Sequence, residues 1–165
     1  SVNGNNVTFY GLFVEHFQQY QVLWNGNNGK TFFYQSELPY DAPNQAAWMN
    51  GTSNGWASYK VKDTVTTHEA WGMGVYAVFT MNACTLASQC GSGVCGTDGF
   101  FTAPNPLMQS DRAIEAPDAQ AGVKFHDMVT LSLTAKGKLN NVINATGGTA
   151  NPIDFSTYPR LVSWH

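Results

Sequence analysis

The stretch Thr31-Phe-Phe-Tyr-Gln-Ser-Glu-Leu-Pro-Tyr40 indicates the fold. Aromatic and β-branched residues favour an extended strand, and Pro39 ends it because proline has no backbone N–H for a sheet. The strand would carry Glu37 on a sheet surface. A similar strand, residues 7–14, leads into Glu15, and the two acids are offset in sequence by 37 − 15 = 22. That offset is near one coil of a stacked β-architecture, so the two carboxylates are predicted to lie one above the other.

The same strand signal recurs along the chain, between turns rich in Asn and Gly. Shifting residues 7–15 by 22 overlays them on residues 29–37, which favours an all-β parallel β-helix; a β-sandwich is the alternative. No stretch indicates a long helix, and residues 41–54 are predicted to form a loop. The predicted strands are 7–14, 21–24, 30–37, 59–62, 75–80, 125–133 and 141–144.

The composition excludes several classes of protein. Only 12% of the 165 residues are charged, with 8 Lys+Arg against 11 Asp+Glu, while 13% are aromatic. This balance is typical of an extracellular, β-rich protein, and without a basic patch nucleic acid is not an expected partner. No apolar run reaches the roughly 20 residues of a membrane helix. We predict one domain, 1–165, with an irregular excursion rich in Cys, Gly and Pro at about 82–118.

Cysteines and glycosylation motifs agree with a secreted protein. Cys84, Cys90 and Cys95 lie in one Gly/Ser-rich stretch, and we predict a local disulfide between Cys84 and Cys90 with the third thiol left over. Ser1 in place of an initiator methionine indicates a processed chain or a fragment of a longer one. A β-helix needs several coils and caps, so we expect an N-terminal half or a second chain as partner. The Asn-x-Thr acceptors are Asn6, Asn50 and Asn144.

Several motifs resemble glycoside hydrolase family 55. Gln35-Ser-Glu-Leu-Pro-Tyr40 resembles its Gln-Thr-Glu-Thr-Pro-Tyr signature, and Val14-Glu-His-Phe-Gln-Gln-Tyr20 is similar to the preceding coil, which also carries an acid. Gly72-Met-Gly-Val-Tyr-Ala-Val-Phe79 resembles the Gly-x-Gly-x-Tyr-x-x-Phe coil of the family. The resemblance covers the C-terminal part of such an enzyme. It implies half of a double right-handed, pectate-lyase-like β-helix that hydrolyses β-1,3-glucan.

The resemblance also implies roles for individual residues. Glu37 would be the general acid, Glu15 would hold the attacking water, and Gln35 would lie beside them. Leu38 and Ser36 depart from the signature, which implies a changed substrate or lost activity. The family inverts the anomeric configuration, whereas acids stacked on adjacent coils would lie roughly 5 Å apart, the spacing of retaining enzymes. Splayed side chains or a base elsewhere would reconcile the two.

Aromatic rings are the expected contacts for a sugar. Trp24, Tyr40 and Trp48 are predicted to stack on substrate, and His16 to bind substrate or to orient Glu15. Core packing is the alternative for each ring. We predict no metal and no cofactor, because no cluster has metal-ligand spacing and no Gly-rich loop fits a phosphate motif. The predicted function is hydrolysis of β-1,3-glucan or a related wall polysaccharide. The alternatives are a non-catalytic wall-binding or structural subunit and, third, a polysaccharide lyase.

Overall fold

A computed structural model of the protein describes residues 1–79, 108–134, 137–152, 156 and 158–165. The described residues form strands and one short 3-10 helix, η1 (Gln45–Ala47), so the all-β prediction is confirmed. None of their helices is long and apolar enough to cross a membrane. The strands are β1 (Thr8–Phe13), β2 (Val22–Trp24), β3 (Gly29–Glu37), β4 (Met49–Asn50), β5 (Ser53–Asn54), β6 (Tyr59–Val61), β7 (His68–Ala77), β8 (Met108–Ser110), β9 (Ile114–Glu115), β10 (Val123–Ser132), β11 (Gly137–Leu139) and β12 (Arg160–Trp164).

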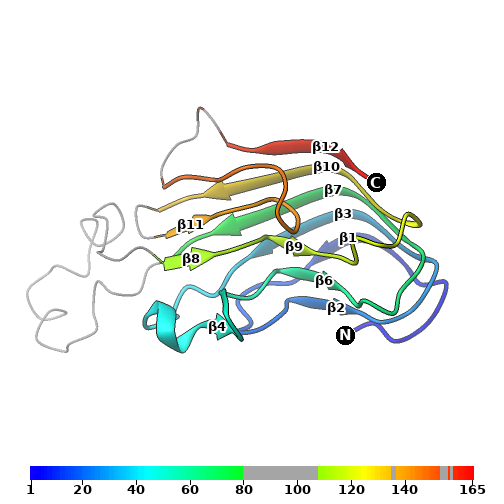
Figure 1. The fold of residues 1–165 in the computed structure, drawn as a ribbon, viewed down its shortest axis with the longest axis horizontal. Helices are drawn as coiled ribbons and strands as arrows, with labels where there is room; N and C mark the ends of the chain where they lie inside the picture. The colour runs from blue at the N-terminus through cyan, green and yellow to red at the C-terminus, as the bar shows by residue number, and fades with distance from the viewer. Residues whose placement is uncertain (80–107, 135–136, 153–155, 157) are drawn as a thin grey trace, which may run out of the picture.

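The chain returns repeatedly to one large sheet with the order β1-β3-β7-β10-β12. The first four strands are mutually parallel, and β12 lies antiparallel on β10 at the top of the stack in Figure 1. Between these visits the chain adds β2, β6 and β9 to a second parallel sheet, and β8 and β11 to a third. Each return adds one coil. This parallel stacking differs from the antiparallel strands of an immunoglobulin-type sandwich.

The predicted offset of 22 is confirmed by the register of the first two coils. Thr8 lies opposite Lys30 and Phe13 opposite Gln35, and the sequence numbers differ by 22 in both pairs (30 − 8 and 35 − 13). Later coils are longer: Lys30 pairs with Glu69 (69 − 30 = 39) and Glu69 with Lys124 (124 − 69 = 55). In the 39-residue offset the extra residues lie between β3 and β6, so the register of the large sheet is preserved while the sequence period is lost.

Stacked asparagines fix the register of one corner. Asn6 and Asn28 have left-handed backbones with φ of 60° and 57°. The Asn28 side-chain amide donates to the Asn6 side chain at 3.2 Å, and Thr67 in the third coil donates to Asn28 at 2.7 Å. Because the same turn recurs one coil higher, the amides satisfy each other and each strand begins at the same height.

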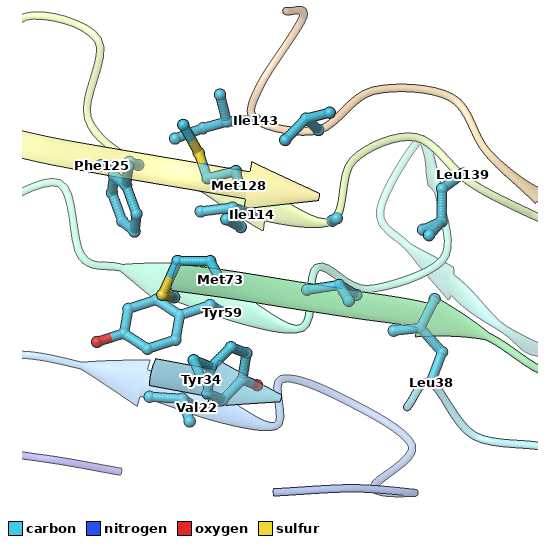
Figure 2. Packing of buried hydrophobic residues seen from close by; sticks show 14 of the residues in the cluster. Val22, Tyr34, Leu38, Tyr59, Met73, Ile114, Phe125, Met128, Leu139 and Ile143 are labelled. Atoms are coloured by element: carbon cyan, nitrogen blue, oxygen red, sulfur yellow. The ribbon is translucent and has the colours of Figure 1, made fainter. Parts of the chain in front are cut away.

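The core lies between the sheets and is filled by the inward-facing side chains of successive coils. Figure 2 shows side chains from successive coils converging on one apolar interior. A polar chain crosses it: the Tyr59 hydroxyl lies 2.9 Å from the Thr31 hydroxyl and 3.0 Å from Nε2 of His68. The labelled residues of Figure 2 are Val22, Tyr34, Leu38, Tyr59, Met73, Ile114, Phe125, Met128, Leu139 and Ile143.

A column of left-handed residues bends all four parallel strands at one height. Gly11, Phe33, Gly72 and Asp127 have φ of 67°, 67°, 68° and 54°. Their flanking residues pair in register, so the four positions stack. The kink places one additional residue on the outer face, as a β-bulge does. The outward positions that follow it carry Gln35 and Glu37, so the column determines which side chains reach the surface.

This column predicts an inverted alanine–glycine preference at exposed Asp127. D127A and D127G remove the same carboxylate, but only the alanine keeps a Cβ at positive φ. We expect D127G to unfold with a free energy about 1 kcal/mol higher than D127A, measured by denaturant titration. At an ordinary strand position the alanine variant is the more stable one. A free energy of unfolding of D127A equal to or above that of D127G would therefore contradict the left-handed geometry.

Some predicted boundaries differ from the observed ones. β7 begins at His68 rather than residue 75, and β8 and β9 lie within the C-terminal part of the predicted irregular excursion. β12 was not predicted, and in the predicted strand 141–144 Ile143 alone forms isolated bridges, to Ile114 and Thr146. Cys84, Cys90 and Cys95 fall outside the described residues, so the disulfide stays a prediction.

Candidate active site

The two predicted acids come together on the outer face of the large sheet. Glu37 is the last residue of β3, and Glu15 follows β1 on the neighbouring coil. The backbone N–H of His16 donates to the Glu37 carbonyl at 3.1 Å, which continues the stacking past the end of β1. One ligand atom each from Glu15, His16 and Glu37 lies within 4.8 Å of the others. The offset between the first two coils therefore builds a compact group of two carboxylates and an imidazole.

Glu37 is held by two side chains that contact the same carboxylate oxygen. The Tyr40 hydroxyl donates to Oε2, and Nε2 of His16 lies 3.2 Å from Oε2. The rings of His16 and Tyr40 also contact each other, with centroids 4.3 Å apart. Burial, and then the adjacent Glu37 carboxylate, raise the pKa of Tyr40 above its usual value, so this hydroxyl keeps its proton and donates it.

Glu15 is held more loosely than Glu37. Its Oε1 accepts a long hydrogen bond of 3.5 Å from the side-chain amide of Gln35. Gln35 occupies the outward position of β3 that pairs with Phe13 of β1. The prediction that Gln35 lies beside the acids is consistent with this contact, and the long distance leaves Glu15 room to reorient.

Both departures from the family signature lie on the core side of β3. Ser36 is fully buried, and the Ser58 hydroxyl donates to it at 2.6 Å. Leu38 is fully buried too and belongs to the hydrophobic core. Neither side chain faces the acids, because inward and outward positions alternate along the strand. These two substitutions therefore alter packing rather than the outer surface.

The two tryptophans predicted to stack on sugar are buried, and this corrects the sequence interpretation. Trp24 is 0% and Trp48 is 2% exposed. Trp24 packs against Tyr59, and the Trp48 indole donates to the Gln18 carbonyl at 2.9 Å. Each is a core residue, and neither ring face is accessible to a sugar. The side to which a short strand points depends on its register, which the sequence of the strand alone does not give.

An aromatic ladder occupies the outer face instead. Tyr10, Phe32, Trp71 and His126 lie in register on β1, β3, β7 and β10, with nearly parallel rings 5.1, 4.6 and 5.3 Å apart. The inner rings cover one another's faces, and Tyr10 at the end of the ladder is 78% exposed. Sequence reasoning missed this ladder, although the offset that relates the two acids also connects Tyr10 to Phe32.

A large polar cavity lies over the second sheet, away from the acids. Its volume is about 740 Å³, and its lining includes Lys60, Asp111, Glu115 and Asn140. These groups are engaged internally: Lys60 donates to Glu115 at 2.8 Å, and Asn140 donates to Asp111 at 3.1 Å. Glu15 and Glu37 lie outside this cavity, on an open sheet face.

The three glycosylation acceptors differ in how their amides are engaged. The Asn144 amide donates to the Ala116 carbonyl at 2.8 Å and to Asp118 at 2.6 Å. The Asn50 amide donates to the Tyr20 hydroxyl at 3.0 Å, while Asn6 accepts from the neighbouring coil. Glycosylation stays a prediction at all three positions.

Among the described residues, Glu15, His16 and Glu37 are the group whose donors converge enough to hold a metal ion. An imidazole and two carboxylates are donors that a transition metal accepts. Each side chain also has a protein partner: His16 and Tyr40 at Glu37, and Gln35 at Glu15. The proposed chemistry below uses the carboxylates themselves.

Stacked parallel strands with a carboxylate pair on the outer face place the chain in the β-helix class of proteins. Residues 1–37 match a protein family described as the LAM55 pectate lyase-like domain. The resemblance to glycoside hydrolase family 55 is confirmed by a relative that matches nearly the whole chain. An exo-beta-1,3-glucanase of Streptomyces sp. (strain SirexAA-E / ActE) is 43% identical over 163 residues, covering 96% of this chain and 23% of the relative.

Two solved structures show the same similarity. The structure of sacteLam55A from Streptomyces sp. SirexAA-E is 43% identical, with a TM-score of 0.81 over 99% of this chain and 25% of that protein. A glutamate-to-alanine variant of sacteLam55A, in complex with glucose, matches with the same TM-score at 42% identity. The chain thus spans about a quarter of the length of the relatives it matches.

Proposed function

We propose that the chain is the catalytic part of a secreted β-1,3-glucan hydrolase, built as a right-handed parallel β-helix. The observation that carries the proposal is the convergence of Glu15 and Glu37 on neighbouring coils within the signature segment. The 43% identity to an exo-beta-1,3-glucanase and the glucose complex of a close structural neighbour support the substrate class. Burial of Ser36 and Leu38 supports retained activity, because both departures point away from the acids.

In the proposed mechanism Glu37 protonates the glycosidic oxygen. The proton leaves the Glu37 carboxyl group as the bond between that oxygen and the anomeric carbon breaks, and the bonding electrons go to the leaving oxygen. Glu15 holds a water molecule, which adds to the anomeric carbon and gives its proton to the Glu15 carboxylate. Oε2 of Glu37 is anchored by His16 and Tyr40, so Oε1 is the oxygen that can face the substrate.

The separation of the acids bears on the stereochemistry. Oxygens of Glu15 and Glu37 lie within 4.8 Å, closer than a water-mediated inversion needs. Among the described residues, the hydrogen bond that holds Glu15 is the long one from Gln35, so substrate and water can displace this side chain. Because the family that the chain resembles inverts the anomeric configuration, we propose inversion, with Glu15 moving outward when water enters between the acids.

We propose that a further part of a longer protein, or a second chain, completes the cleft. The acids lie on an open sheet face, and Tyr10, Phe13 and Phe33 expose apolar surface on the strands that lead to them. Relatives of about four times this length support such a partner. The experiments below accordingly use the intact protein that carries this chain.

Proton NMR of laminarin hydrolysis tests this function. The intact protein is expected to release α-glucose first, because inversion at a β-linkage gives the α-anomer. Spectra recorded in the first minutes, before mutarotation, distinguish the anomers. Initial β-glucose would make Glu15 a nucleophile rather than a water-binding group. Binding without any sugar released would instead support the non-catalytic wall-binding alternative.

A further inference from the structure

His16 contacts one of the two carboxylate oxygens of Glu37. Its Nε2 is 3.2 Å from Oε2, the oxygen that also accepts the Tyr40 hydroxyl. Both contacts therefore hold one edge of the carboxyl group, and within the part of the chain that the structure describes no hydrogen bond reaches Oε1. The exposed fraction of the side chain is 48% for His16 and 21% for Glu37, so the imidazole shields one side of the acid from water.

The backbone of His16 is arranged for this contact. Its φ of 66° is left-handed, a conformation that residues with a Cβ adopt at an energetic cost. The backbone N–H donates to the Glu37 carbonyl at 3.1 Å, which ties the strained residue to the coil that carries the acid. Strain of this kind persists where the surrounding structure requires it. Here it places Nε2 of the imidazole within hydrogen-bond distance of Glu37, with Glu15 in the same group.

The chemistry of the pair determines which atom holds the hydrogen. When Glu37 is ionised, Nε2 must carry the hydrogen, because a bare ring nitrogen and a carboxylate oxygen at 3.2 Å repel each other. A hydrogen bond to an ionised carboxylate is stronger than one to its neutral form. The contact thus becomes stronger as the proton leaves Oε1, which stabilises the transition state more than the ground state.

We propose that His16 is a positioning residue for the general acid. Its Nε2–H donates to Oε2, orients Oε1 toward the glycosidic oxygen, and stabilises the carboxylate left on Glu37 after proton transfer. This inference rests on the function proposed above. The sequence-based roles of His16, binding substrate or orienting Glu15, stay predictions beside this one.

Glycine and glutamine substitutions test the proposal in the intact protein. H16G removes the ring and suits the positive φ, so the backbone is unstrained. We expect kcat on laminarin to fall about tenfold to a hundredfold with KM unchanged. H16Q keeps an N–H donor at similar reach and should recover most of the rate, and added imidazole should raise the rate of H16G.

Two further variants, H126Q as a matched control and E37Q, distinguish a failure of the His16 role from a failure of the proposed function. His126 pairs with Glu69 at 3.0 Å on the same sheet face, and H126Q is expected to leave kcat unchanged. H16G with wild-type kcat, or with a raised KM alone, would overturn the positioning role. If wild type and E37Q hydrolyse laminarin equally, or if neither hydrolyses it, the proposed function itself fails. If E37Q is inactive while H16G is fully active, only the role of His16 is refuted.

Discussion

Replacing Glu37 by glutamine is expected to lower kcat on laminarin by about a thousandfold. The amide cannot donate a proton of the required acidity, yet it keeps the shape of the side chain and can still accept from Tyr40. KM and the free energy of unfolding should therefore change little. Initial-rate kinetics with laminarin, together with binding of the same glucan by calorimetry, measure both effects.

Glu69 supplies the matched control for this substitution. It lies on the outer face of β7 and contacts His126 at 3.0 Å, much as Glu37 contacts His16. E69Q removes the same charge from the same sheet face and is expected to keep wild-type kcat. If E37Q keeps its activity, or if E69Q loses as much, Glu37 is not the general acid.

The second large effect is a loss of stability in acid that depends on His68. This residue is 2% exposed, its Nε2 contacts the Tyr59 hydroxyl at 3.0 Å, and its Nδ1 has no hydrogen-bond partner among the described residues. Burial lowers the pKa of His68 to about 3 from its ordinary 6.5. The folded protein therefore keeps His68 neutral at pH values where the unfolded chain binds a proton.

The sign of the effect follows from this difference in proton binding. Stabilisation by neutral His68 is complete above pH 6.5 and is lost as the pH falls toward 3, at about 1.4 kcal/mol for each pH unit. Denaturant titrations of wild type and H68L between pH 7.5 and pH 4 measure this loss. The carboxylates contribute equally to both proteins, so their contributions cancel when one free energy of unfolding is subtracted from the other. The stability of wild type relative to H68L should fall as the pH decreases.

An exposed histidine provides the comparison for His68. His165 lies at the surface, and H165Q is expected to leave the pH dependence of unfolding unchanged. If the difference in unfolding free energy between wild type and H68L stays constant across the pH range, His68 takes up its proton in the folded core as it does in the unfolded chain. That result would contradict the lowered pKa that burial gives this residue.

The sequence predicted the part of the fold that has no insertions. The first two coils are offset by 30 − 8 = 22, so β1 and β3 overlay directly and Glu15 falls beside Glu37. The following offsets, 69 − 30 = 39 and 124 − 69 = 55, are longer and unequal, so the sequence has no constant period and the start of β7 was not predicted. An antiparallel β12 depends on a pairing distant in sequence, for which local strand propensity carries little signal.

The site was predicted less completely than the fold. Composition and motif located the acids, but not the contacts of His16 and Tyr40, because these depend on a left-handed turn and on side-chain direction. Trp24 and Trp48 were assigned to the surface because a short strand or loop does not show which way its ring points. The ladder from Tyr10 to His126 became visible only when the register of four strands was known.

The most direct test of Glu37 as the general acid uses a substrate that needs no acid. With 2,4-dinitrophenyl β-glucoside the leaving group departs without protonation, so loss of the acid should matter little. We predict that E37Q in the intact protein hydrolyses this glucoside within about tenfold of the wild-type rate while losing about a thousandfold on laminarin. Equal losses on both substrates would contradict the account, because Glu37 would then act in binding or folding rather than as the proton donor.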